Sequence, residues 1–92
     1  MSLTHALIRV SGTVQMVGYR YFALRAAKGL GLTGCVTNEQ DGSVTVVVEG
    51  ERASIDELVE RLSEGPSTAI VDDLRVDWSD YTGEFIEFTV EY

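Results

Sequence analysis

A short glycine-containing stretch that ends in an arginine, residues 12–20 with the sequence GTVQMVGYR, holds the residues best suited to chemistry. It joins an apolar strand pattern to a helix pattern, so Arg20 should lie at the start of a helix. A helix N-terminus carries about half a positive charge, and a cation there is unfavourable unless an anion lies between them. Loop N–H groups, the helix N-terminus and one guanidinium together suit a phosphate-sized dianion. The sequence therefore predicts a phosphate site at Arg20.

Composition limits the partners of such a site. The chain has 92 residues with 15 acidic against 7 basic side chains, a formal net charge of −8. This charge, with no cluster of Lys or Arg, argues against nucleic acid as a partner. It also repels phosphorylated molecules at long range, so a phosphate site must work through local, partly desolvated contacts. The expected partner is a small molecule.

The chain has the size of one small domain, and we expect residues 1–92 to fold as a unit. A single cysteine, Cys35, cannot form an internal disulfide, and the N-terminal residues do not resemble a secretory signal. No apolar run approaches the roughly 20 residues that a membrane span needs. These features predict a cytoplasmic protein without a membrane partner.

Metal chemistry has little support in the sequence. His5 is the only histidine, and it provides neither a zinc ligand set nor a triad. The acidic residues of 72–80 lack the spacing of a calcium loop and are expected on a solvated strand edge. Cys35 has no base near it in sequence and is expected to be a small, buried residue. We therefore expect no metal.

Hydrophobic periodicity predicts five strands and two helices. Apolar residues that alternate with polar ones predict five strands, over residues 5–11, 33–38, 43–49, 70–78 and 84–91. The turn signal at 38–42 indicates that the second and third of these strands form a hairpin. In the last strand the alternation would bury Ile86, Phe88 and Val90. Helical spacing predicts one helix over 20–30 and another that begins with a Ser54–Glu57 capping box and ends at Gly65-Pro66.

The order βαββαβ with a terminal strand predicts an α+β protein, the ferredoxin-like α/β sandwich, with two helices on one face of an antiparallel sheet. A helix separates the first two strands, so they should run parallel and end at the same edge of the sheet. Asn38, at the end of the second strand, should therefore be a neighbour of the 12–20 loop.

These residues resemble the acylphosphatase family, whose pattern is GxVQGVxFR after the first strand, then GxVxN, then DGxV. This chain has GTVQMVGYR at 12–20, GCVTN at 34–38 and DGSV at 41–44. The similarity continues through the second helix to Val71, so it covers nearly the whole chain. The three segments keep the order and spacing of the family pattern.

The resemblance implies an enzyme that hydrolyses small acyl phosphates to a carboxylate and inorganic phosphate, as a monomer and without a metal or cofactor. Arg20 matches the family's phosphate-binding arginine, and Asn38 matches the asparagine that holds the attacking water. The loop matches the backbone cradle for the phosphoryl oxygens, formed by Gln15, Met16, Val17, Gly18 and Tyr19. From the residues themselves, the Gln15 side chain is expected to brace the loop rather than to contact substrate.

Two alternatives to this enzyme remain open. Met16 stands where the family pattern has glycine, and a positive φ there would strain a side chain by about 1–3 kcal/mol. A chain weakened in this way could be a non-catalytic module that binds phosphate or carbamoyl phosphate. A structural or nucleic-acid-binding ferredoxin-like domain is a second alternative, which the net charge of −8 opposes.

Overall fold

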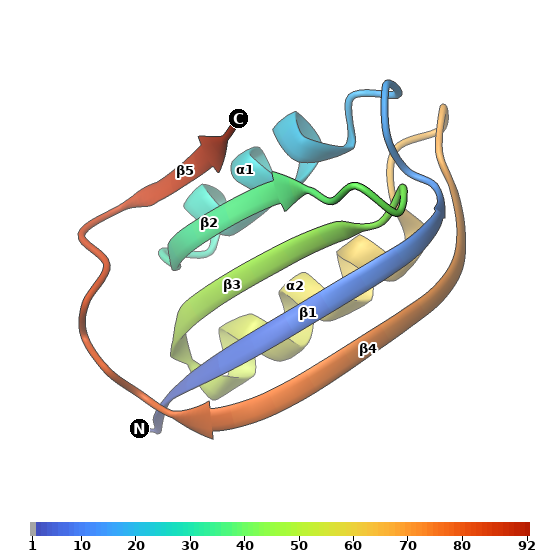
Figure 1. Cartoon of the computed structure of the whole chain (residues 1–92). Coiled ribbons are helices and arrows are strands. Elements are labelled where there is room, and N and C mark those ends of the chain that lie inside the picture. Colours follow the sequence, from blue (N-terminus) through green and yellow to red (C-terminus); the bar gives the residue numbers. More distant parts are fainter. Residues whose placement is uncertain (1) are drawn as a thin grey trace.

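The computed structural model describes residues 2–92, which form a five-stranded sheet with two helices packed on one face (Figure 1). The elements follow in the order β1 (Leu3–Thr13), α1 (Tyr19–Gly29), β2 (Thr33–Asn38), β3 (Val44–Glu51), α2 (Arg52–Glu64), β4 (Ile70–Asp80) and β5 (Phe88–Glu91). The sheet order is β4-β1-β3-β2-β5. The predicted ferredoxin-like α+β architecture is confirmed.

Alternation within the strands determines which side chains meet the helices. In β1, Ala6, Ile8 and Val10 are fully buried, and their cross-strand partners in β3 are valines. The apolar stripes of α1 and α2 cover this face, so that sheet and helices share one core. From the helices the core receives Tyr19, Ala23, Ala26, Ala27, Ile55, Leu58 and Leu62.

The sheet is mixed rather than purely antiparallel, because β5 pairs parallel to β2 while the other neighbours are antiparallel. After β4 the chain runs along one end of the sheet before it pairs again, so it enters β5 in the direction of β2 (Figure 1). This path brings the C-terminal residues beside α1. The predicted parallel orientation of the first two strands is confirmed, since both β1 and β2 are antiparallel to β3.

Two local predictions are wrong. No capping box forms at Ser54, because β3 leads directly into α2; the N-cap is Glu51, without a side-chain hydrogen bond, and Ser54 lies inside the helix. The last strand is shorter than its alternation suggested, since pairing begins at Phe88 and the Ile86 side chain is 95% exposed. Residues 84–87 instead belong to the connection along the end of the sheet. The bounds of α1 differ from the prediction by one residue at each end.

No helix in the described part of the chain is long and apolar enough to cross a membrane.

Candidate active site

A cavity of about 170 Å³ lies where β1 leads into α1, beside the end of β2. It brings together the two side chains that the sequence predicted to be neighbours, Arg20 and Asn38. Among the described residues that line it, Arg20 alone carries a charge, which suits a small anion. The lining consists of Val14, Met16, Gly18, Tyr19, Arg20, Tyr21 and Asn38.

A β-bulge lies near the end of β1, just before the loop that borders this cavity. The register between β1 and β4 shifts between Ser11 and Gly12. Gly12 has a φ of 133°, and a Cβ there would collide with the backbone carbonyl of Ile70. Only glycine allows this close approach of the two strands, which explains why the motif begins with that residue.

The loop then turns through two residues with positive φ. Met16 has a φ of 64° and Gly18, the N-cap of α1, has a φ of 79°. The first hydrogen bond of the helix runs from the Phe22 N–H to the Gly18 carbonyl at 3.1 Å. The N–H groups of Tyr19, Arg20 and Tyr21 therefore make no hydrogen bond within the helix. When a residue in the left-handed backbone conformation lies next to residues in the extended or helical conformation, successive backbone N–H groups point to the same side, as in anion-binding nests. The strain foreseen at Met16 is therefore present.

Gln15 and Val17 do not line the cavity but fix the loop around it. The Gln15 amide donates to the carbonyls of Glu39 at 2.7 Å and Ser43 at 2.9 Å, which ties the loop to the β2–β3 turn. The carbonyl of Val17 accepts a hydrogen bond of 2.6 Å from the Thr68 hydroxyl. The expected bracing role of the Gln15 side chain is confirmed by these contacts.

Asn38 ends β2 and is one of the residues that line the cavity. The carboxamide oxygen is buried and has no hydrogen-bond partner among the described residues. Leaving a buried acceptor unpaired costs about 1–3 kcal/mol, and such atoms in folded proteins have a reason. In this cavity the oxygen is suited to accept a hydrogen bond from a bound water or substrate.

The C-terminal residues hold the Arg20 side chain, which the sequence did not predict. One guanidinium nitrogen donates to the carbonyl of Glu91 at 3.1 Å, and the guanidinium carbon lies 4.8 Å from the centre of the Tyr92 ring. The Tyr92 hydroxyl is in turn 3.1 Å from the hydroxyl of Tyr21. A cation stacked on a ring and bonded to a carbonyl loses much of its rotamer freedom, so Glu91 and Tyr92 orient Arg20 in advance.

Tyr19 and Tyr92 are unsuited to acid–base chemistry at neutral pH. Burial raises the pKa of Tyr19, whose hydroxyl donates to the Leu62 carbonyl at 2.6 Å. The hydrogen bond with Tyr21 raises the pKa of Tyr92. Both phenols therefore stay neutral and serve as packing and hydrogen-bonding groups.

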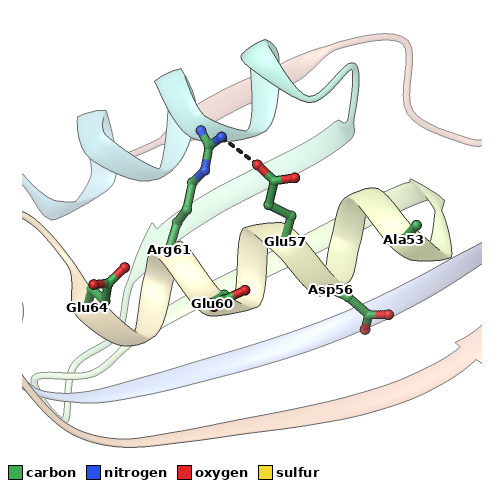
Figure 2. Close-up of a pocket in the computed structure, with 6 residues that line it drawn as sticks. All are labelled: Ala53, Asp56, Glu57, Glu60, Arg61 and Glu64. Atoms are coloured by element: carbon green, nitrogen blue, oxygen red, sulfur yellow. Dashed lines mark hydrogen bonds and ion pairs between the residues drawn. The ribbon is translucent and has the colours of Figure 1, made fainter.

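A larger hollow of about 470 Å³ lies along the surface of α2, but its mainly acidic lining excludes it as a phosphate site. Figure 2 shows its only basic group, Arg61, paired with Glu57 at 2.6 Å. The other lining residues are acidic apart from Ala53: Asp56, Glu60 and Glu64. A dianion would be repelled there. Over residues 2–92, no group of three or more histidine, cysteine or acidic side chains is arranged to hold a metal ion.

Comparison with known proteins agrees with this geometry. The acylphosphatase family model matches residues 6–90. The chain is 46% identical to an acylphosphatase of Salinibacter ruber over 89% of this chain and 86% of that one. It is 41% identical to an acylphosphatase of Pelotomaculum thermopropionicum over the full length of both. The crystal structure of acylphosphatase from Bacillus subtilis superposes with a TM-score of 0.91 at 33% identity, covering 99% of this chain and 100% of that one.

The full-length matches are to acylphosphatases themselves, so a non-catalytic binding module is not favoured. The chain therefore belongs to the acylphosphatase family, and its reaction is the hydrolysis of acyl phosphates.

Proposed function

We propose that Arg20 and the backbone N–H groups of the loop from Gln15 to Tyr19 bind the phosphoryl group, while Asn38 orients the attacking water. The support is a cavity lined by one cation, Arg20, and by Asn38, whose amide oxygen is buried and has no hydrogen-bond partner among the described residues. Phosphoryl transfer spreads negative charge over the equatorial oxygens, and a preorganised guanidinium with loop amides stabilises that charge.

In this reaction the water oxygen forms a bond to phosphorus as the bond between phosphorus and the acyl oxygen breaks. The carboxylate leaves with the electron pair. Its conjugate acid has a pKa of about 4–5 by analogy with side-chain carboxyls, so no general acid is needed. The proton lost by the water passes to a phosphoryl oxygen. Asn38 contributes by holding the water in line with the leaving group.

The observation that carries these roles is the carboxamide oxygen of Asn38. It is buried, has no hydrogen-bond partner among the described residues and belongs to a residue that lines the same cavity as Arg20, so a hydrogen bond from the attacking water would satisfy it. A purely structural asparagine in a hairpin would use its side chain on the turn. Here Asp41 serves the turn instead, accepting from the Ser43 N–H at 2.9 Å.

We further propose that the chain works as a monomeric, single-domain cytoplasmic enzyme, without a metal, a cofactor, or a nucleic-acid or membrane partner. The net charge of −8 supports the exclusion of nucleic acid. The exposed Glu87 and Glu91 in and beside the β5 edge disfavour pairing between copies. The shared core of both helices and all strands supports one folding unit.

Acetyl phosphate in the presence of EDTA is the direct test of the reaction. We expect the protein to release inorganic phosphate from it about a hundredfold faster or more than from phenyl phosphate, because phenoxide is a much poorer leaving group than carboxylate. Samples without protein correct for spontaneous hydrolysis. Saturable phosphate binding without turnover would contradict the proposal and indicate a binding module, and loss of turnover in EDTA alone would indicate a required metal.

A further inference from the structure

Met16 combines two unfavourable features that the phosphate cradle does not explain. Its φ is 64°, a conformation that side chains other than glycine, asparagine and aspartate rarely adopt, and its side chain is completely exposed. A glycine would serve the backbone turn at no cost. Strain of this kind concentrates at functional sites. The side chain itself therefore needs a role, and it lies on the lining of the active-site cavity.

Tyr21 is the second large, exposed side chain on that lining. It is 54% exposed, and its hydroxyl lies 3.1 Å from the hydroxyl of Tyr92. This bond links the outer end of the ring to Tyr92, so Tyr21 presents an aromatic surface at the edge of the cavity. Tyrosine rings are effective contact surfaces because they offer a large apolar area with few rotatable bonds.

Burial assigns an inner and an outer end to the cavity. The inner end is formed by Val14 and Tyr19, each 1% exposed, and by the buried oxygen of Asn38. Met16 and Tyr21 stand at the outer end. If Asn38 holds the water, in-line displacement places the leaving group on the opposite side of phosphorus. The acyl group therefore points outward, past Met16 and Tyr21.

We propose that Met16 and Tyr21 form an acyl subsite that favours acyl phosphates with an aromatic or bulky apolar acyl group over acetyl phosphate. The inference rests on the roles proposed for Arg20 and Asn38. A flexible thioether against the edge of an aromatic acyl ring makes a favourable contact, and the tyrosine ring can stack on it. The methyl group of acetyl phosphate offers much less apolar surface to such contacts.

The ratio of kcat/KM for benzoyl phosphate to kcat/KM for acetyl phosphate tests this subsite. Changes in the cradle affect the shared phosphoryl group of both substrates and cancel in the ratio. We expect Met16→Ala and Tyr21→Ala each to lower the ratio by about fivefold, the loss of one apolar contact at an open mouth. Met16→Gln, which keeps the length but not the apolarity, should lower it similarly, and Met16→Leu should retain it.

Ile86→Ala is the matched control, because Ile86 is apolar, 95% exposed and absent from the cavity lining. It should leave the ratio unchanged. A ratio that stays within about twofold of the wild-type value in both Met16→Ala and Tyr21→Ala would overturn the subsite. Wild-type protein inactive on both substrates would instead contradict the reaction itself, so the two failures are distinguishable.

Discussion

Replacing Arg20 by glutamine is expected to lower kcat/KM for acetyl phosphate by at least about a hundredfold, the usual effect of removing one preorganised donor from developing charge. Arg20 is the only charged group lining the cavity in the described residues, and the Glu91 carbonyl and Tyr92 ring already orient it. Glutamine retains a donor but loses the positive charge and the bidentate geometry. Steady-state kinetics on purified variants measures the loss.

Two comparisons make the Arg20 result specific. Arg25→Gln removes the same charge from an exposed position of α1 and should retain the wild-type rate. Asn38→Ala should lower kcat while inorganic phosphate still inhibits as in the wild type, because that side chain is assigned to the water and not to the phosphate. Arg20→Gln should lose phosphate inhibition as well. Retention of more than about a tenth of the activity by Arg20→Gln would refute its assigned role.

Replacing Glu49 by glutamine is expected to have the largest effect on stability, lowering the free energy of unfolding by about 3 kcal/mol. Glu49 is 1% exposed and accepts from the His5 ring at 2.7 Å. It also accepts from the N–H of Thr82 at 2.9 Å, the Thr82 hydroxyl at 2.7 Å and the N–H of Gly83 at 2.9 Å. A glutamine would turn an NH₂ group toward some of these donors. Thermal unfolding should shift down by about 10 °C or more.

The pH dependence of stability gives an independent signature of Glu49. Burial alone would raise its pKa, but the hydrogen bonds from His5, Thr82 and Gly83 outweigh burial and lower the pKa from 4.5 to about 2. Between these values the unfolded chain binds more protons, so stability rises with pH. The stabilisation is complete above about pH 5 and is lost as the pH falls through about 2.

We therefore expect wild-type unfolding free energy to fall more steeply than that of Glu49→Gln as the pH drops from about 5 to about 2.5. Glu84→Gln, an exposed acid in the connection between β4 and β5, is the control and should follow the wild type. Parallel curves for wild type and Glu49→Gln would show that the carboxylate is not the group that anchors residues 82–83.

Most of the fold could be predicted because the local patterns and the tertiary packing agree. Alternating apolar residues such as Ala6, Ile8 and Val10 face the helices as expected. Prediction failed where nonlocal packing overrode a local pattern. Ile86 continues the alternation of the last strand, yet the chain there has no strand to pair with, because it is still crossing the end of the sheet. The path of the backbone, which periodicity does not encode, decided the outcome.

The site was predictable only in its local parts. Arg20, Asn38 and the loop lie within motifs and at strand ends that share one edge of the sheet. The C-terminal hold on Arg20 was not predictable, because it depends on the parallel pairing of β5 with β2. The Glu49 cluster was hidden for a similar reason. Glu49 alternates with the buried valines of β3, a pattern that predicts an exposed side chain. It is buried because residues 82–83, in the connection after β4, pack back over it and donate hydrogen bonds to its carboxylate.

Titration of inorganic phosphate into ¹⁵N-labelled protein, followed by amide NMR, tests directly whether Arg20 and the loop amides bind the phosphoryl dianion. We expect saturable shifts at the amides of residues 15–21 and at the Arg20 guanidinium, which disappear in Arg20→Gln and persist in Arg25→Gln. Loop amides that stay unmoved at phosphate concentrations that inhibit the enzyme would contradict this binding mode.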